Sequence, residues 1–534
     1  MDTKALRQKV LDLAIRGKLV PQDPNDEPAS VLLERIRLQK QQMVKEGKLK
    51  PKDIKNDTII FVGEDSLHYE KFADGSVKCI EDEIPFDLPD GWQWARLGCL
   101  AQYKKGPFGS SITKAMFVPD TPDAVKIYEQ RNAINKDATL GSYFISAEKY
   151  ETLKGFEVFP NDIIVSCAGT IGETYVLPTG MRKGIINQAL MKISLYDLGI
   201  IDFYLMYFDF QLKSAAQEQG HGIALKNIPP FDVLKRYLVP IPPIQEQQRI
   251  IETVNDLLSK VDSIDADSEA ISNLIAQTKS KILDLAIRGQ LVPQDPEDEP
   301  ASVLLERIRE EKEELIRQGK IKRDKKESVI FKGEDNSYYL YDGQITVDIN
   351  DDLPFDIPDS WLWVRLKDVF LINPRNKLHD SLEVSFIPMP LIDDGYSGKH
   401  TAEVRQWKKV KTGFTHFAEG DIGIAKITPC FENRKSTVFN NLANGYGAGT
   451  TELHILRPYS QAILTQYLLA YVKSDYFVEN GKRTFTGAVG QQRISKEYVE
   501  NAYFPIPPIT EQERIVKHIR AIFEYLNMIS DALS

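Results

Sequence analysis

The chain has 534 residues, of which 42% are hydrophobic and 27% are charged. This length suggests roughly three or four domain-sized units, and the composition excludes a mostly disordered chain. The net charge of −10 argues against a uniformly basic nucleic-acid binder, but residues 91–240 carry +2 and residues 360–508 carry +4, so the remainder carries −16. Two mildly basic blocks in an acidic frame are compatible with a nucleic acid held in two places.

The cysteines and the apolar runs exclude further classes of protein. Cys79, Cys99, Cys167 and Cys430 lie far apart and form no CxxC pair, so we expect reduced thiols rather than a zinc site or a disulfide framework. The histidines also lack the spacing of metal ligands. No apolar run reaches the roughly 18 residues of a membrane span, and residues 1–20 contain no long apolar core. We therefore expect a cytoplasmic protein without a membrane partner.

A nearly identical internal repeat organises the chain. Residues 9–37 differ from residues 281–309 at only three of 29 positions, and both segments contain the string LVPQDP. Three pairs of matching blocks make up the repeated frame: 9–37 with 281–309, 84–97 with 353–366, and 240–250 with 505–515. Between these blocks the two halves diverge almost completely, apart from similarly laid out segments at 155–173 and 413–433. A constant frame around two variable inserts is the logic of a scaffold that presents two different readers.

Each constant block leads into a predicted helix, at about 28–46 and about 300–318, and each helix ends at a glycine. Their polar sides are densely charged, as in ERIRLQKQQ and ERIREEKEE, which is typical of a solvated face. A docking surface for a partner subunit is the alternative. The Lys-rich stretches that follow, at 48–55 and 320–326, are predicted linkers.

A long central helix is predicted over about 244–288, with a length of roughly 67 Å at 1.5 Å per residue. Its apolar positions alternate in steps of four and three, which is a heptad seam. The seam residues are Ile250, Val254, Leu257, Val261, Ile264, Ile271, Ile275, Ile282 and Leu285. Residues 515–533 repeat the first part of this seam, and residues 6–13 repeat its last part. If the chain ends meet, their helices rebuild a second copy, and an antiparallel pair with pseudo-two-fold symmetry follows; unrelated terminal helices are the alternative.

The variable inserts are predicted to be mixed α/β domains. Each opens on a Trp-x-Trp element in a predicted strand, Trp92 with Trp94 and Trp361 with Trp363. Alternation places both rings of a pair on one face, where we expect core packing rather than base stacking. Short β-rich runs such as DIIVSC and TELHILRP follow. Helices are predicted over 203–217 and 467–480.

Polar and basic residues cluster at loop-like positions of both inserts. Arg and Lys can pair with guanine edges, and Asn or Gln with adenine edges, although most such residues in a DNA binder touch phosphates or solvate a loop. We interpret them as candidate DNA contacts. In the first insert they are Lys104, Lys105, Arg131, Asn132, Thr170, Asn187, Gln188, His221 and Lys226. In the second insert they are Arg375, Asn376, Lys408, Lys409, Thr428, Asn433, Arg434, Lys435, Gln491 and Arg493.

The sequence lacks the motifs of a DNA-modifying enzyme. A methyltransferase needs a glycine-rich loop and an amide-Pro-Pro-aromatic element, and the nearest string, NIPPF at 227–231, has one residue too many. Gly220, His221 and Gly222 lack the third glycine of the nucleotide fingerprint, and there is no GxxxxGK[ST] loop for an ATP motor. We therefore predict no catalytic site, no metal site and no cofactor in this chain.

The blocks LAIRGKLVPQDPNDEPAS, LPDGWQWARL and PIPPIQEQQRI, each present twice in closely similar form and in the same order, resemble the specificity subunit of type I restriction-modification systems. The resemblance covers nearly the whole chain. It implies that each insert is a target-recognition domain for one half of a split double-stranded DNA sequence. It also implies that the constant helices set the spacing and bind two modification subunits, which carry S-adenosylmethionine and methylate adenine, and that restriction subunits add ATP- and Mg-dependent translocation and cleavage. It supplies no base-contact motif, so the candidate contacts rest on side-chain chemistry alone.

These features together predict an α/β (α+β) fold, with two mixed α/β target-recognition domains separated by long antiparallel coiled-coil helices in a pseudo-two-fold internal repeat. The expected parts are an N-terminal helical region (1–58), a first recognition domain (59–243), a central coiled coil (244–328), a second recognition domain (329–508) and a C-terminal helix (509–534). Such a spacer would suit a bipartite target whose halves lie roughly one to two helical turns apart. A helical scaffold without DNA contact and a divergent nucleic-acid methyltransferase stay open as alternatives.

Overall fold

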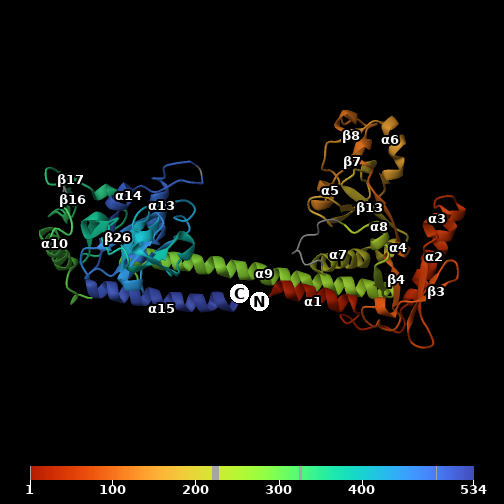
Figure 1. The fold of residues 1–534 in the computed structure, drawn as a ribbon, viewed down its shortest axis with the longest axis horizontal. Helices are drawn as coiled ribbons and strands as arrows, with labels where there is room; N and C mark the ends of the chain where they lie inside the picture. The colour runs from red at the N-terminus through yellow and green to blue at the C-terminus, as the bar shows by residue number, and fades with distance from the viewer. Residues whose placement is uncertain (1, 219–227, 324–327, 489, 534) are drawn as a thin grey trace. The chain divides into compact units, whose positions relative to one another are not determined.

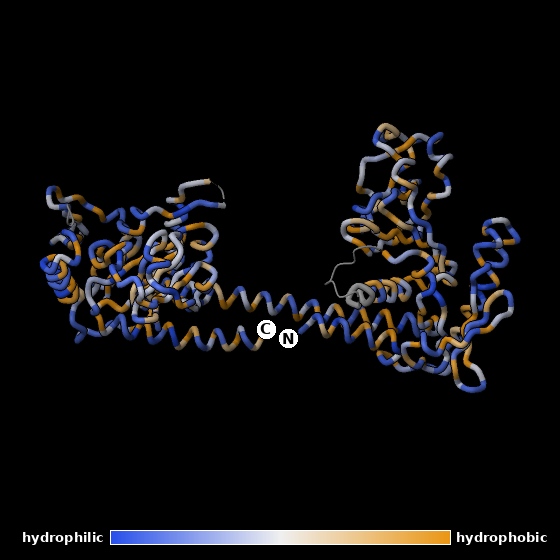
Figure 2. The backbone as a smooth tube through the Cα atoms, in the orientation of Figure 1, coloured by the Kyte–Doolittle hydropathy of each residue, from blue (hydrophilic) through white to orange (hydrophobic). Residues whose placement is uncertain are grey.

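The computed structural model describes residues 2–218, 228–323, 328–488 and 490–533. By its contacts the chain divides into an N-terminal unit, residues 2–266, and a C-terminal unit, residues 267–534. The boundary falls inside the long helix α9 (Ile244–Ile287). The bounds of α9 confirm the helix predicted over 244–288. Figure 2 shows hydrophobic and hydrophilic residues alternating along this helix, as its heptad pattern requires.

The N-terminal unit contains fourteen strands and eight α-helices before α9 among its described residues. In chain order they are α1 (Thr3–Ile15), α2 (Ala29–Lys45), α3 (Pro51–Ile54), β1 (Thr58–Val62), β2 (His68–Phe72), β3 (Val77–Cys79), β4 (Gln93–Arg96), α4 (Leu97–Leu100), β5 (Ala101–Lys105), β6 (Phe117–Val118), β7 (Val125–Tyr128), α5 (Gln130–Ile134), β8 (Phe144–Ile145), α6 (Ala147–Leu153), β9 (Glu157–Val158), β10 (Ile163–Ser166), β11 (Thr174–Val176), β12 (Gly184–Ile186), β13 (Leu190–Leu195), α7 (Ile201–Glu218), α8 (Phe231–Leu234) and β14 (Leu238–Ile241). The strands form sheets of order β1-β2-β3, β14-β4, β11-β10-β13-β5 and β6-β8-β7-β12-β9.

The C-terminal unit follows the same plan after α9. In chain order its elements are α10 (Ala301–Arg317), β15 (Val329–Lys332), β16 (Tyr338–Tyr341), β17 (Thr346–Asp348), β18 (Leu362–Arg365), α11 (Leu366–Val369), β19 (Phe370–Ile372), β20 (Glu383–Ile387), β21 (Glu403–Gln406), β22 (Thr415–Ala418), β23 (Ile422–Ala425), β24 (Ser436–Val438), β25 (Tyr446–Gly449), β26 (Leu453–Pro458), α12 (Thr465–Val472), α13 (Asp475–Lys482), α14 (Lys496–Asn501), β27 (Tyr503–Ile506) and α15 (Ile509–Leu533). Its sheets have the orders β15-β16-β17, β18-β27, β19-β26-β23-β24 and β21-β20-β25-β22.

The two units share their strand connections although the inserts diverge in sequence. The sheet β5-β13-β10-β11 of the N-terminal unit corresponds to β19-β26-β23-β24 of the C-terminal unit. In the neighbouring sheets, β12 pairs parallel with β7 and antiparallel with β9, just as β25 pairs with β20 and β22. The segments 155–173 and 413–433, which match in layout, contain β9–β10 and β22–β23. The mixed α/β character predicted for each insert is confirmed.

Three of the predicted helices are confirmed and one is corrected. The helices expected over 28–46 and 300–318 are α2 and α10, and the one expected over 203–217 is α7. The single helix expected over 467–480 is wrong, because the segment divides into α12 and α13. Ser474 is extended there, and its hydroxyl oxygen caps α13 by accepting a hydrogen bond from the Phe477 amide.

The Trp-x-Trp elements are buried, which confirms the expected core packing. Trp92 packs among residues of α1, α7 and α9, whereas Trp94 packs against the β1-β2-β3 sheet. Trp361 and Trp363 divide between two clusters in the same way. The expectation that both rings of a pair share one face of the core is therefore wrong, because each pair joins two separate cores.

A buried carboxylate joins the constant blocks in both units. Trp92 Nε1 donates to Glu246 Oε2 at 3.0 Å, and Gln22 Nε2 donates to Glu246 Oε1 at 3.1 Å. In the C-terminal unit Glu511 accepts the equivalent bonds from the Trp and Gln side chains at 2.9 and 2.6 Å. The LVPQDP block, the Trp element and the start of the long helix thus form one hydrogen-bonded joint. Burial raises the pKa of Glu246 above its ordinary value of 4.5, in spite of these hydrogen bonds.

We expect Glu246→Ala to destabilise the N-terminal unit by about 2–3 kcal/mol, because it leaves the buried indole N–H without an acceptor. Glu246→Gln should cost less than half as much, since its amide oxygen still accepts from Trp92. The pKa of Glu246 is higher in the folded chain than its ordinary value of 4.5, so the folded state binds this proton more tightly than the unfolded state does. The resulting stabilisation is fully present below pH 4.5 and is lost as the pH rises through the folded-state pKa. The wild type should therefore gain stability as the pH falls from neutral, and the glutamine variant should lack this gain.

Hydrogen–deuterium exchange of the full chain over residues 244–258 measures both effects. The C-terminal unit, which keeps Glu511, serves as the internal reference. Equal losses in the alanine and glutamine variants would contradict the role of Glu246 as an acceptor.

Within the N-terminal unit, α1 runs antiparallel to the first part of α9. Arg7 near the start of α1 forms an ion pair with Asp262 at 2.6 Å, whereas Gln22, beyond the end of α1, reaches Glu246 at the start of α9. In the C-terminal unit α15 contacts the last part of α9. Part of α9 is therefore covered by α1 in the N-terminal unit, and another part is covered by α15 in the C-terminal unit.

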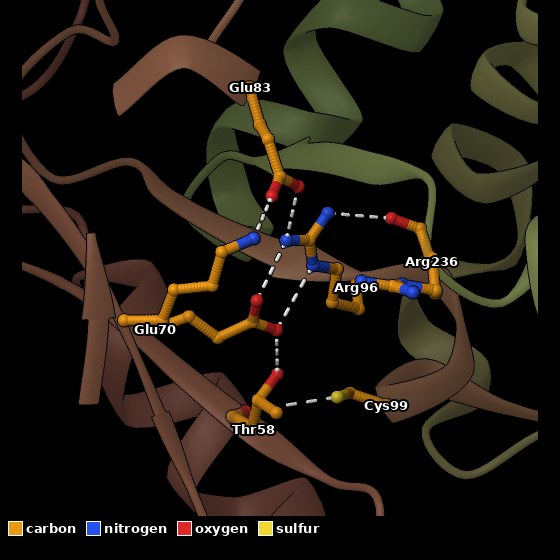
Figure 3. A network of polar contacts seen from close by, with 7 residues as sticks. Thr58, Glu70, Glu83, Arg96, Cys99 and Arg236 are labelled. Carbon is orange, nitrogen blue, oxygen red and sulfur yellow. Dashed lines mark hydrogen bonds and ion pairs between the residues drawn. The ribbon is translucent and has the colours of Figure 1, made fainter. Parts of the chain in front are cut away.

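A buried ion-pair network fixes the β1-β2-β3 sheet to the strand of the Trp element (Figure 3). Arg96 is 8% exposed and Glu70 is 4% exposed, and the guanidinium donates to both carboxylate oxygens, from Nε at 3.1 Å and from Nη2 at 2.8 Å. Arg96 also donates to Glu83 at 2.7 Å and to the Arg236 carbonyl at 2.7 Å, and Thr58 Oγ1 donates to Glu70 at 2.6 Å. Burial alone would raise the pKa of Glu70, but the hydrogen bonds from Arg96 and Thr58 outweigh it, and the pKa lies below its ordinary value.

Candidate nucleic-acid interface

Three loops of the N-terminal unit meet at one edge of the sheet β11-β10-β13-β5. Lys105 at the end of β5 pairs with Met191 near the start of β13, and Ser166 at the end of β10 pairs with Leu190. Because neighbouring strands are antiparallel, the loop after β5, the loop after β10 and the turn before β13 leave the sheet on the same side. We call these segments, 106–111, 167–173 and 187–189, the N-terminal loop edge.

Backbone contacts hold this edge together. The Gly106 amide donates to the Leu190 carbonyl at 2.9 Å, and the Cys167 amide donates to the Ala189 carbonyl at 2.8 Å. A Cβ atom on Gly106 would lie 1.8 Å from the Asn187 carbonyl oxygen, so only glycine fits there. The loops are therefore presented on a fixed backbone, which suits the positioning of recognition side chains.

Four of the predicted contacts of the first insert lie on or beside this edge. Lys105, Thr170 and Gln188 are exposed. Asn187 is half-buried, and its side-chain oxygen accepts a hydrogen bond from the Ala189 amide at 3.0 Å. Lys104 is also exposed, but its ammonium lies 5.0 Å from the centre of the Phe156 ring, away from the loops.

The other predicted contacts of this insert are placed differently. Arg131 on α5 is half-exposed and forms an ion pair with Glu129 at 3.0 Å. Asn132 is fully buried, and its amide group donates to the Asp137 and Leu140 carbonyls. The prediction that Asn132 contacts a base is therefore corrected, because both donors of its amide are used to hold the turn after α5. His221 and Lys226 lie outside the described residues.

The C-terminal unit carries the corresponding edge, formed by segments 373–376, 426–428, 450–452, 486–488 and 490–493, the C-terminal loop edge. The Asn373 amide donates to the Ile455 carbonyl at 2.7 Å, and the Lys426 amide donates to the Glu452 carbonyl at 3.0 Å. The last segment is held by the Thr428 amide, which donates to the Gln492 carbonyl at 2.9 Å. This edge therefore also presents its loops on a fixed backbone.

Five predicted contacts of the second insert lie on this edge, and two of them are corrected. Arg375 and Gln491 are exposed, and Arg493 is held by two hydrogen bonds to the Glu452 carboxylate, each 2.9 Å, which raise the pKa of the Arg493 guanidinium. Asn376 is occupied, because its amide donates to the Phe417 carbonyl and accepts from Arg457. Thr428 is buried, and its hydroxyl accepts from the Gln492 amide at 3.1 Å. We therefore leave Asn376 and Thr428 out of the base readers.

The remaining predicted contacts lie away from the C-terminal loop edge. Arg434 donates to the Lys473 carbonyl and forms an ion pair with Asp475, and Lys435 donates to the Ile392 carbonyl. These two cations are used inside the domain, which corrects their predicted role, whereas Asn433 beside them is exposed. Lys408 and Lys409 are exposed on a short 3-10 turn, 407–409, after β21.

Two further residues, one beside the N-terminal loop edge and one on it, were not predicted. The side chain of Gln130 on α5 lies next to Gly169 of the edge, since its Nε2 would be 3.4 Å from a Cβ there. Phe108 protrudes from the loop after β5 and is 87% exposed. Phe108 belongs to no polar or basic cluster; its signal in the sequence is the string KKGPFGSS, with an aromatic residue between Pro and Gly after two lysines.

The described part of the chain contains no cluster of three or more His, Cys, Asp or Glu side chains arranged to hold a metal ion. Among the helices described, none combines the length and the apolar character that crossing a membrane requires.

The family model for the type I restriction modification DNA specificity domain matches this chain twice, over residues 89–273 and over residues 358–532. The two matches together include more than half of the chain, and each contains one of the two loop edges. The chain belongs to this family. The family assignment confirms the resemblance on which the sequence prediction rests, and its two matches agree with the internal repeat.

Part of this chain is similar to part of each of several curated relatives. The chain is 48% identical over 243 residues to the type I restriction enzyme EcoAI specificity subunit of Escherichia coli, and 45% identical over 243 residues to the EcoEI specificity subunit of the same species. Each alignment covers 45% of this chain and 38% of the relative, so the matched part spans well under half of these relatives. The HsdS subunit from Thermoanaerobacter tengcongensis aligns at 17% identity with a TM-score of 0.40, over 85% of this chain and 94% of that chain.

Proposed function

We propose that this chain is the sequence-specific DNA-binding specificity subunit of a type I restriction-modification complex, and that it carries no catalytic site. Each loop edge reads one half of a bipartite double-stranded target. The observation that carries the proposal is that the family model for a DNA specificity domain matches twice, once around each of two sheet edges with the same strand connections.

The side chains on the two edges suit different parts of a duplex. The exposed ammonium group of Lys105 beside the N-terminal loop edge attracts phosphates, as do those of Lys408 and Lys409 away from the C-terminal loop edge, and such contacts make binding weaken as salt rises. Gln188 and Gln491 are exposed on opposite units and offer the paired donor and acceptor that an adenine edge requires. The phosphate contacts position the chain, and the amide groups distinguish one base from another.

The chemistry belongs to partner subunits in this proposal. Two modification subunits bring S-adenosylmethionine and methylate adenine, and restriction subunits add ATP- and Mg-dependent translocation and cleavage in the cytoplasm. The helices α1, α9 and α15 form the antiparallel, coiled-coil spacer of a pseudo-two-fold arrangement that fixes the distance between the half-targets. The slight positive charge of the inserts, +2 and +4, suggests that tight binding requires these subunits to close around the DNA.

Exchange of the first insert tests the proposal. Residues 98–239 are replaced by the corresponding insert of another family member, with joints beside the β4–β14 strand pair, and the chimera is expressed with the modification subunits of its host. We expect one half of the methylated sequence to change and the other half and the spacing to stay as they were, because the two inserts read independently. Methylome sequencing of the cells measures the result.

The reciprocal exchange of residues 367–502 is the matched control, and it should change the other half. If both halves of the target stay unchanged in both chimeras, the chain does not read DNA. Binding of the assembled complex to duplex DNA that is undetectable, or that does not weaken between low and physiological salt, would favour a scaffold without DNA contact.

A further inference from the structure

Phe108 is the most exposed large hydrophobic residue that the structure describes, at 87% exposure. A single exposed apolar side chain on a protein surface needs no explanation by itself. Phe108 differs because it stands on the N-terminal loop edge, which also presents exposed polar and basic side chains. Lys105, Thr170 and Gln188 are exposed on the same edge.

The loop holds Phe108 outward on both sides. Pro107 before it is buried, and Ile112 after it is only 7% exposed and belongs to a core cluster. Between these anchors the chain makes a tight 3-10 turn, in which the Ser111 amide donates to the Phe108 carbonyl at 2.8 Å. The ring is therefore presented by a backbone that is ordered before any ligand arrives, and this reduces the entropy lost on binding.

The C-terminal unit has a different residue at the corresponding position. The strands β5 and β19 begin at Ala101 and Phe370, which pair with Leu195 and Pro458, and each strand follows directly after the short helix α4 or α11. Seven residues further along stand Phe108 in one unit and Lys377 in the other, and both are exposed. Two domains with the same frame thus present an aromatic ring and an ammonium group at this position.

We propose that Phe108 is a specificity-determining wedge, which inserts between two base pairs of the half-target read by the N-terminal unit. This inference rests on the proposed function. A phenyl ring offers no hydrogen bond to a base edge, so its favourable contacts with DNA are stacking against base faces and apolar contact with a thymine methyl group. In the first case the ring enters a base step, and wedges of this kind unstack the step and kink the duplex. Such a residue selects steps that unstack easily, whereas the Lys377 ammonium at the corresponding position would attract a phosphate.

The test uses the full chain together with the modification subunits that co-purify with it. The probe is a 40-bp duplex that carries the methylated target of the wild type, with 2-aminopurine placed at successive positions of each half. Wild type should raise the 2-aminopurine fluorescence at one step of the half read by the N-terminal unit, because the wedge unstacks that step. Phe108→Ala should abolish the rise and weaken binding by about 10-fold. Phe108→Trp should keep the affinity, and stacking should quench the fluorescence of its indole.

Phe159 provides the matched control. It is 54% exposed, but it precedes the start of β10, at the end of the sheet opposite the loop edge. Phe159→Ala should leave both the affinity and the 2-aminopurine signal as in the wild type.

Three results would overturn the inference. Unchanged affinity and unchanged 2-aminopurine signal in Phe108→Ala would show that the ring does not enter the duplex. Loss of the co-purified subunits in that variant, with target discrimination intact, would make Phe108 a protein contact. A wild-type complex that binds target and scrambled duplex equally would remove the proposed function together with the wedge, whereas the first two results leave that function standing.

Discussion

Glu70→Leu is expected to destabilise the N-terminal unit by about 3–5 kcal/mol, because it leaves the buried guanidinium of Arg96 without its two-bond partner. Glu83 and the Arg236 carbonyl still contact Arg96, but neither replaces the carboxylate that faces both Nε and Nη2 (Figure 3). The hydroxyl of Thr58 loses its acceptor as well. Hydrogen–deuterium exchange of the full chain over residues 58–79 measures the loss, with residues 329–348 of the C-terminal unit as internal reference.

The double variant Glu70→Leu, Arg96→Met is the matched control and should recover most of the lost stability, because it removes both buried charges at once. The C-terminal unit naturally has the first of these two substitutions, a leucine in place of the glutamate, but keeps the arginine. Leu340 stands in β16 where Glu70 stands in β2, and Arg365, the equivalent of Arg96, is half-buried with its Nε lacking a hydrogen-bond partner among the described residues. A double variant as unstable as the single one would show that packing around Glu70, rather than charge pairing, holds this sheet in place.

The same network makes the stability of the N-terminal unit depend on pH in the acidic range. The pKa of Glu70 in the folded chain lies below its ordinary value of 4.5, so the carboxylate contributes stability above 4.5, and this contribution is lost as the pH falls through the folded-state pKa. The protection factor for exchange over residues 58–79, which is corrected for the intrinsic pH dependence of amide exchange, should therefore fall in the wild type below pH 4.5. Glu70→Leu should lack this acid-dependent step.

The repeat explains why much of the frame could be predicted from the sequence. Nearly identical blocks build similar local structures, and the charged helices after them end at glycines, so α2 and α10 match their predicted bounds within one residue. The seam of α9 is equally local, because its period is set within one helix. The strand order of the inserts is not local. It depends on pairs such as Lys105 with Met191, which lie far apart in the chain and differ in sequence between the two units.

The candidate contacts were only partly predictable, because a polar side chain satisfies backbone groups as readily as base edges. Asn132 and Asn376 have the chemistry of adenine readers, yet carbonyl groups of their own domain occupy their amides. Gln188 and Gln491 have the same chemistry and are exposed. Composition cannot separate these two groups, since the difference is made by the surrounding turns. Phe108 offers no side-chain hydrogen bond, so the hydrogen-bonding chemistry of the sequence does not indicate it.

Gly106→Ala is expected to destabilise the N-terminal loop edge by about 3 kcal/mol, because overpacking against backbone cannot be relieved by a side-chain rotation. The added Cβ would lie 1.8 Å from the Asn187 carbonyl oxygen and 2.5 Å from its carbonyl carbon. The end of β5 and the turn at 187–189 would have to separate, which breaks the bond from the Gly106 amide to the Leu190 carbonyl. Recognition of the half-target should fail together with this stability, because Lys105, Phe108 and Gln188 are attached to the segments that move apart.

Gly109→Ala is the matched control in the same loop. No heavy atom of the described residues outside the immediate chain neighbours lies within 4 Å of a Cβ at Gly109, and its side of the turn is exposed, so the stability should stay within about 0.5 kcal/mol of the wild type. Hydrogen–deuterium exchange over residues 187–195 and methylome sequencing are read for both variants. Methylation by a complex that contains the Gly106→Ala chain should lose its preference at the half-target of the N-terminal unit and keep the other half, since the C-terminal loop edge is unaltered. Equal behaviour of the two alanine variants would mean that the contact between the end of β5 and the turn before β13 does not position the loops that read DNA.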